Sequence, residues 1–343
     1  MLSRSMATTV AVTTIFIFAT LAPCSGLRAA NATDPQIWFS PQSGTGAAAP
    51  DYMELFRADS PWASAASRVS VLGVSESFVM NRSDGELQLM FADLARRHIR
   101  LGLAMSPLES RPSAEAPQCG VGVEGFSAPP QALALARKVK RLGGTIDYYT
   151  MDEPLYFGHF YSGDPKDGQT SKRSGCHLSI DDIAKDAAKR IRDVRSVFPD
   201  VRIGDVEPLM EFSDNEWAGV LSQWFDAFHA ATGDHLAYFV LDLTWAKPWQ
   251  RRMAELTSLL HAKQVPLQVI YDGSGVAPSD RVWVDQAEQR FKEFEGANGL
   301  RPEGVRIQSW NKSPSRALPE NDPGTLSNLV LRYVKWKDSQ RGK

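Results

Sequence analysis

Paired carboxylates follow two short apolar runs of the chain. Residues 149–154 read Tyr-Thr-Met-Asp-Glu-Pro and contain Asp152 and Glu153, and residues 204–208 read Gly-Asp-Val-Glu-Pro and contain Asp205 and Glu207. Carboxyl groups that meet in one site repel one another, so the pKa of one rises and that group can donate a proton. Hydrolysis of a glycosidic bond requires such a donor and a second carboxylate that acts as nucleophile or base.

Other apolar runs end in residues of the same kind. Asp242 and Asp272 each close a run, and Gln308 closes the last one. Aromatic residues accompany these positions, and flat rings can pack on the apolar C–H faces of sugars. We therefore predict Glu153 as the general acid, with Asp152, Glu207 or Asp272 as the second carboxylate. The predicted substrate-binding residues are Trp38, Asp205, Asp242, Trp245, Tyr271, Gln308 and Trp310.

Eight strand-like segments alternate with amphipathic helical segments along most of the chain. The strand-like segments are Ile37–Gln42, Val69–Val79, Leu101–Pro107, Ile146–Asp152, Val201–Glu207, Ala237–Trp245, Pro266–Asp272 and Gly304–Trp310. Short apolar runs rich in Val, Ile, Leu and Tyr are typical of buried parallel strands. The alternation predicts a single-domain (β/α)8 barrel, which places active-site residues at the C-terminal ends of its strands. An open doubly wound sheet is the alternative, but no Gly-rich phosphate turn follows the first segment.

Two long connections and two cysteines suggest a link across the active-site face. The segments Leu108–Pro130 and Leu155–His177 follow the third and fourth predicted strands, and each contains one cysteine, Cys119 or Cys176. In an oxidising compartment, such a pair often forms a disulfide. We therefore expect a Cys119–Cys176 bond between neighbouring loops.

The first 30 residues have the features of a signal peptide. Arg4 precedes an apolar stretch that is too short for a stable membrane span, and small residues follow as far as Ala30. We expect cleavage to leave a barrel domain at residues 31–343, secreted or periplasmic and without stable membrane insertion. The formal net charge of −2 offers no basic excess for binding nucleic acid.

The predicted strand ends resemble those of the (β/α)8 glycoside hydrolase superfamily, over residues 35–335. Glu153 stands where its large retaining clan keeps the acid/base, Asp272 where the clan keeps its nucleophile, and Trp310 where a tryptophan often floors the sugar subsite. The clan normally has Glu in place of Asp272 and Asn in place of Asp152. The Asp152–Glu153 pair also resembles the barrel hexosaminidases, in which the Asp orients the N-acetyl group of the substrate. The resemblance implies an oligo- or polysaccharide substrate and no cofactor.

Two other functions remain open from the sequence. Carboxylates on the fourth, fifth and sixth strands could bind a hard divalent cation, as in enolase-type barrels. Alternatively, the barrel could bind glycans without cleaving them, because binding and catalysis use the same aromatic residues. There is no zinc motif and no nucleophile elbow.

Overall fold

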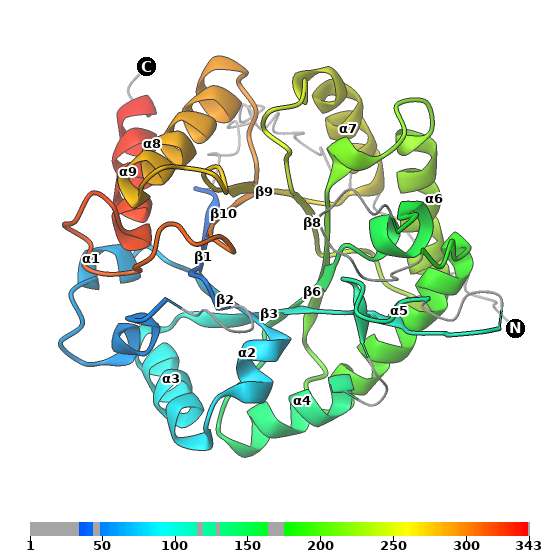
Figure 1. Cartoon of the computed structure of the whole chain (residues 1–343), viewed down its shortest axis with the longest axis horizontal. Helices are drawn as coiled ribbons and strands as arrows, with labels where there is room; N and C mark the ends of the chain where they lie inside the picture. Colours follow the sequence, from blue (N-terminus) through cyan, green and yellow to red (C-terminus); the bar gives the residue numbers. More distant parts are fainter. Residues whose placement is uncertain (1–33, 44–48, 115–118, 128–130, 164–174, 342–343) are drawn as a thin grey trace, which may run out of the picture. The chain divides into compact units, whose positions relative to one another are not determined.

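Eight parallel strands close into a barrel in a computed structural model of the chain (Figure 1). The structure describes residues 34–43, 49–114, 119–127, 131–163 and 175–341, and these residues form one compact unit. The barrel strands are β1 (Gln36–Ser40), β2 (Val71–Ser75), β3 (Arg100–Met105), β6 (Tyr148–Asp152), β7 (Arg202–Glu207), β8 (Tyr238–Leu241), β9 (Leu267–Tyr271) and β10 (Gly304–Gln308). They pair in the order β1-β10-β9-β8-β7-β6-β3-β2, so the predicted (β/α)8 barrel is confirmed.

Helices surround the barrel in the connections between its strands (Figure 1). They are α1 (Ala63–Ala66), α2 (Glu76–Asn81), α3 (Asp84–Arg97), α4 (Gln131–Arg141), α5 (Ile180–Arg195), α6 (Trp217–Thr232), α7 (Gln250–Lys263), α8 (Asp280–Phe291) and α9 (Leu326–Gln340). Ser83 and Glu86 form a capping box at the start of α3, and the Ser179 hydroxyl caps α5. No helix in the described part of the chain is long and apolar enough to cross a membrane. The predicted signal peptide lies outside the described residues.

The second predicted strand is shorter than the sequence indicated. We expected extended backbone throughout Val69–Val79, but β2 ends at Ser75 and α2 begins at Glu76. The Ser75 hydroxyl accepts a hydrogen bond from the Phe78 backbone N–H, which satisfies one of the free donors at a helix start. A capping residue inside an apolar run therefore ended the strand, and the apolar pattern alone did not reveal it.

Two inward-facing glycines create space inside the barrel for side chains of the neighbouring strands. A Cβ at Gly102 would lie 2.3 Å from the Trp38 ring, and a Cβ at Gly73 would lie 2.1 Å from the Ser40 hydroxyl oxygen. Both separations are far below van der Waals contact. Because side chains alternate along a strand, Trp38 and Ser40 point to the same side, with Trp38 one layer deeper. The small residues of β2 and β3 thus determine how Trp38 and Ser40 are accommodated.

The loops after β3 and β6 are joined by the expected disulfide between Cys119 and Cys176. The loop after β3 also contains a small parallel sheet, in which β4 (Leu108–Glu109) pairs with β5 (Phe126–Ser127). Ionic contacts connect this loop to α5, where Lys189 pairs with Glu109 at 2.8 Å. These links attach the loop after β3 to the barrel wall beside β6.

Loss of the disulfide should destabilise the protein without removing the barrel. The bonded cysteines are 57 residues apart, and a cross-link of that span restricts the unfolded chain substantially. We expect replacement of both Cys119 and Cys176 by Ser to lower the free energy of unfolding by about 2–4 kcal/mol, measured by urea denaturation. Reductant should destabilise the parent to a similar extent and leave the double variant unchanged. Equal stability of parent and variant without reductant would show that the bond does not form.

Candidate active site

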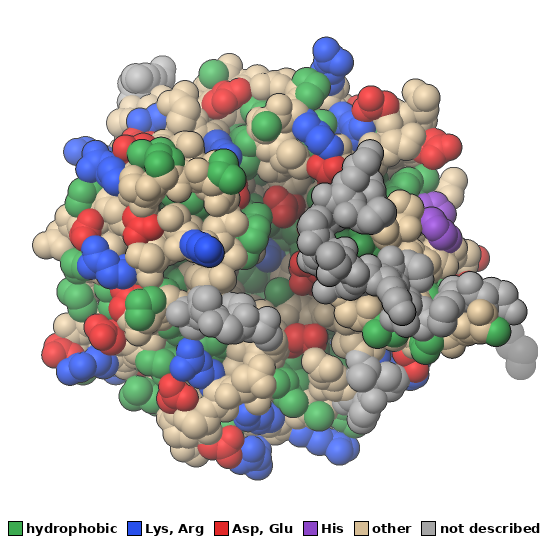
Figure 2. Space-filling model, viewed as in Figure 1, with side chains coloured by type: hydrophobic (Ala, Val, Ile, Leu, Met, Phe, Trp, Pro, Cys, Tyr) green, Lys and Arg blue, Asp and Glu red, His purple; other side chains and the backbone are tan. Residues whose placement is uncertain are grey.

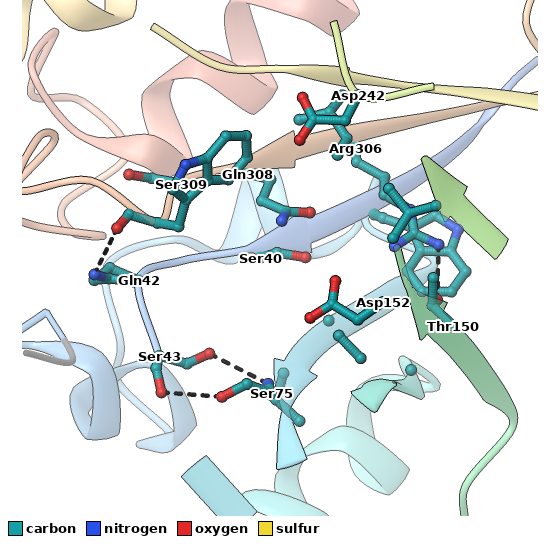
Figure 3. Close-up of a pocket in the computed structure, with 18 of the residues that line it drawn as sticks. Ser40, Gln42, Ser43, Ser75, Thr150, Asp152, Asp242, Arg306, Gln308 and Ser309 are labelled. Carbon is teal, nitrogen blue, oxygen red and sulfur yellow. Dashed lines mark hydrogen bonds between the residues drawn. The ribbon is translucent and has the colours of Figure 1, made fainter. Parts of the chain in front are cut away.

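A cavity of about 380 Å³ opens at the C-terminal ends of the barrel strands. It is visible as a hollow with acidic side chains inside it in Figure 2, and Figure 3 shows its lining. Its polar and aromatic lining includes Trp38, Ser40, Gln42, Ser43, Ser75, Glu124, Thr150, Asp152, Glu153, Asp242, Arg306, Gln308, Ser309 and Trp310. Six of the predicted site residues therefore lie together in this lining, namely Trp38, Asp152, Glu153, Asp242, Gln308 and Trp310.

Three carboxyl groups in this lining have no hydrogen-bonding partner among the described residues. They belong to Asp152 and Glu153, at the end of β6, and to Asp242, directly after β8. All three side chains are partly buried. Buried polar groups are normally paired, so unpaired ones at a cavity indicate a place for a ligand or for chemistry. Asp152 and Asp242 face the same space in Figure 3.

The backbone at Glu153 adopts a conformation that is unusual for a residue with a side chain. Its φ angle is +49°, in the left-handed region. The Glu153 N–H still donates to the carbonyl oxygen of Val206 on β7, at 3.1 Å. Such backbone strain persists only where the surrounding structure enforces it, and it tends to occur at functional sites. The tight turn lets Asp152 and Glu153 both line the cavity although they are adjacent in sequence.

Glu207 stabilises that turn from outside the cavity. Its carboxylate accepts hydrogen bonds from the backbone N–H groups of Leu155, at 2.6 Å, and Tyr156, at 3.0 Å. The side chain is completely buried. We predicted Glu207 as a second carboxylate opposite Glu153, but the structure places it behind the turn with its oxygens occupied. In the structure the Glu207 carboxylate therefore holds the backbone of the turn that carries Glu153.

Burial and mutual repulsion raise the pKa values of the cavity carboxyls. The pKa of Glu153 lies well above its ordinary range because of burial, and the negative charges of Asp242 and Glu124 raise it further. Burial also raises the pKa of Asp152, with contributions from Glu124 and Glu76. Burial and the neighbouring Asp272 raise the pKa of Asp242 to about 7. Carboxyls of this kind retain protons near neutral pH and can act as acids.

Two further predicted acids also lie outside the cavity lining. Asp205 is fully buried and accepts a hydrogen bond from the Trp224 indole of α6, at 2.7 Å. Asp272 forms an ion pair with Arg290 of α8, at 2.5 Å. Burial raises the pKa of Asp272 to about 6, although Arg290 opposes the rise. Because neither residue lines the cavity, Asp152 and Asp242 are the acids that the lining places with Glu153.

The predicted aromatic residues divide into one rim residue, one floor residue and two wall residues. Trp310 lines the cavity and is 44% exposed, so its ring is accessible to a ligand. Trp38 forms part of the floor, is only 1% exposed, and has Arg306 over its ring at 4.1 Å. Tyr271 points into the helix layer, where its hydroxyl donates to Glu295 at 2.9 Å. Trp245 packs against Tyr271 and Trp249 and does not line the cavity.

Sequence reasoning missed Ser40 and Arg306. Arg306 is buried at the cavity floor, where it donates to Gln268 and Thr150, each at 3.0 Å. Side chains alternate along a strand, so Ser40 shares the inward face of β1 with Trp38. In the same way, Arg306 shares the inward face of β10 with Gln308, and apolar residues between them face outward. This period-two pattern was the available signal, because it identifies inward positions on strands that we had already predicted.

Among the residues that the structure describes, no three His, Cys, Asp or Glu side chains are arranged to hold a metal ion. A metal site on the fourth to sixth strands would need carboxylates from β6, β7 and β8 to converge. Those of β7, Asp205 and Glu207, point away from the cavity. The described geometry therefore does not assemble the ligand set that the sequence left open.

Asp242 should make the stability of the protein depend on pH. Its pKa is about 7 in the folded protein against an ordinary 3.8, so the folded state binds the proton more tightly and loses stability as pH rises between these values. An Asp242→Asn variant lacks this penalty. We expect the variant to gain ~2 kcal/mol relative to the parent between about pH 5 and about pH 8, measured by urea unfolding. The surface variant Asp226→Asn serves as control, and a pH-independent difference for Asp242→Asn would contradict the expectation.

No protein-family model matches the chain, and no curated protein matches its sequence. Solved structures with a similar fold include morphinone reductase in complex with tetrahydroNAD, with 13% identity, coverage of 79% of this chain and 81% of that chain, and a TM-score of 0.44. A thermostable xylanase mutant from Cellvibrio japonicus has 10% identity, coverage of 81% and 87%, and a TM-score of 0.46. An aldo-keto reductase from Klebsiella pneumoniae has 13% identity, coverage of 86% and 85%, and a TM-score of 0.41. These proteins differ in activity, so the likeness concerns the fold alone.

Proposed function

We propose that the protein is an exported glycoside hydrolase with Glu153 as its general acid. The observation that carries this proposal is the group of three partly buried carboxyls, Asp152, Glu153 and Asp242, that line one cavity without hydrogen-bonding partners in the described chain. Glycosidic bond hydrolysis needs a protonated carboxyl beside an ionised one. The raised pKa values favour a proton on at least one of the three near neutral pH.

In the proposed reaction, Glu153 gives its proton to the glycosidic oxygen as the bond from that oxygen to the anomeric carbon breaks. Asp242 follows β8, whereas Glu153 follows β6, so the two approach the substrate from different strands. Asp242 then either takes a proton from the attacking water or bonds to the anomeric carbon until water displaces it. The adjacent Asp152 offers a third route, in which it orients an N-acetyl group of the substrate as the nucleophile.

Two further features support a carbohydrate substrate at an exported enzyme. Trp310 presents an accessible ring at the rim of the cavity, where a sugar face could pack. The Cys119–Cys176 disulfide joins two loops of the same barrel face and suits an oxidising compartment. Export also requires that residues 1–30 act as the signal peptide.

Removing the proton of Glu153 should abolish cleavage. We expect Glu153→Gln to lower kcat/KM by a factor on the order of 10²–10⁴ on whichever member of a broad glycan panel the parent cleaves, since the amide cannot act as the acid. Glu109→Gln is a matched control, because Glu109 follows β3 and pairs with Lys189 without lining the cavity. Equal activity of parent and Glu153→Gln would place the acid elsewhere. Glycan binding by a parent that cleaves nothing would favour the non-catalytic alternative.

Glu207 should affect turnover through the turn that it stabilises. Replacement by Gln removes one of two acceptor atoms and presents an N–H to a backbone N–H. We expect Glu207→Gln to lower the free energy of unfolding by ~1–3 kcal/mol and to lower kcat more than it changes KM, measured by urea unfolding and by steady-state kinetics. A fall in kcat without any loss of stability would instead assign Glu207 a direct part in the chemistry.

A further inference from the structure

Ser40 and Gln308 lie side by side at the cavity. They are register partners on the adjacent strands β1 and β10. Figure 3 shows both side chains pointing into the space that Asp152 and Asp242 also face. Ser40 is only 8% exposed. Within the described part of the chain, neither the Ser40 hydroxyl nor the Gln308 side-chain amide makes a hydrogen bond, although both line the cavity.

Small residues of the neighbouring strands flank this pair. The Ser40 hydroxyl packs on Gly73 of β2, where a Cβ would collide with it. Gly73, together with Gly102 and Ala104 of β3, also lines the cavity. Because no larger side chain projects from these positions, a ligand in the cavity can reach the side chains of Ser40 and Gln308.

The acidic residues of the cavity come from strands other than β1 and β10. In the strand order, β1 and β10 are separated from β6 by β2 and β3 on one side and by β9, β8 and β7 on the other. Asp152 and Glu153 come from β6, and Asp242 from β8. The mouth thus has a wall of uncharged hydrogen-bonding groups facing an acidic wall.

Arg306 is the one cation among the described residues of the lining, and it does not compensate the acidic wall for an anionic ligand. Arg306 is 5% exposed and donates to Gln268 and Thr150, and its guanidinium lies between the rings of Trp38 and Tyr238. Glu124, Asp152, Glu153 and Asp242 line the same cavity. Above the pKa of about 7 of Asp242, these groups carry more negative charge than Arg306 offsets, so a carboxylate or phosphate entering the cavity is repelled.

We propose that Ser40 and Gln308 are specificity-determining residues that bind two neighbouring hydroxyl groups of an uncharged sugar ring, an inference that rests on the proposed glycosidase function. A hydroxyl and a carboxamide each donate and accept, so they match sugar hydroxyls, which also do both. A buried site of this kind discriminates strongly, since a sugar lacking the hydroxyl leaves the protein groups unpaired. The ring carries the scissile bond toward Glu153 while its hydroxyl edge rests against β1 and β10.

The test measures binding rather than turnover. The intact protein is titrated with xylose, glucose, galactose and mannose, with glucuronate and glucosamine as charged probes, by isothermal titration calorimetry and ligand-observed NMR. We expect at least one neutral sugar to bind, and glucuronate to bind at least about tenfold more weakly than glucose at about pH 8, where the Asp242 carboxyl with its pKa of about 7 is mostly ionised. Ser40→Ala and Gln308→Leu should each weaken the neutral sugar by about 5–10-fold. Ser258→Ala, on the exposed face of α7, is the matched control.

A second measurement assigns the hydroxyls. Singly deoxygenated versions of the sugar that binds are compared on the parent, Ser40→Ala and Gln308→Leu. Ser40→Ala should bind the complete sugar and one of the deoxy sugars equally well, because the hydroxyl group that Ser40 binds is missing from that deoxy sugar. Gln308→Leu should likewise bind the complete sugar and the deoxy sugar altered at the adjacent carbon equally well. Melting temperatures of both variants check that they are folded, and if Ser40→Ala is unfolded, Gln308→Leu alone decides.

The inference is overturned if no neutral sugar binds, if both variants bind it as the parent does, or if glucuronate binds as well as glucose. Its failure is distinguishable from failure of the proposed function. Sugar binding that depends on Ser40 and Gln308 without any cleavage would support the inference and refute the glycosidase. Cleavage that depends on Glu153 but not on these two residues would do the reverse.

Discussion

The arrangement of the site depends on two hydrogen bonds that the Glu207 carboxylate accepts from the backbone of Leu155 and Tyr156. They fix the chain immediately after β6, where Glu153 adopts its left-handed conformation. Backbone N–H groups buried without acceptors are costly, and the fully buried Glu207 supplies the acceptors that the turn cannot supply itself. Together with the hydrogen bond from the Glu153 N–H to Val206, this support holds Asp152 and Glu153 in the wall of one cavity.

The carboxyls of the barrel mouth divide according to whether the fold has given them partners. Asp205, Glu207 and Asp272 are paired with an indole, two backbone N–H groups and a guanidinium respectively. Asp152, Glu153 and Asp242 have no such partners in the described chain, and their raised pKa values follow from burial and from one another. Leaving carboxyls unpaired and partly buried reduces stability, so the arrangement is expected where chemistry or binding requires it.

The same barrel layer has a second, uncharged region. Inward-facing glycines on β2 and β3 make room for Trp38 and Ser40, and Ser40 then stands beside Gln308. The floor is completed by Arg306 over the ring of Trp38. The mouth thus combines an acidic wall suited to proton transfer with a wall suited to hydroxyl groups, and the exposed Trp310 at its rim.

The sequence by itself determined the barrel and the order of its strands along the chain, because buried parallel strands and amphipathic helices have different apolar periods that are local properties of the chain. It did not determine where β2 ends. It also indicated the disulfide and the importance of the strand end at Asp152 and Glu153. It could not separate Asp242 from Glu207 or Asp272, because all three are acids at strand ends. Only the tertiary structure decided that, since pairing with Arg290 or with the backbone of Leu155 and Tyr156 depends on contacts between distant segments. The placement of Ser40 beside Gln308 and against Gly73 likewise exists only once β1, β2 and β10 are adjacent.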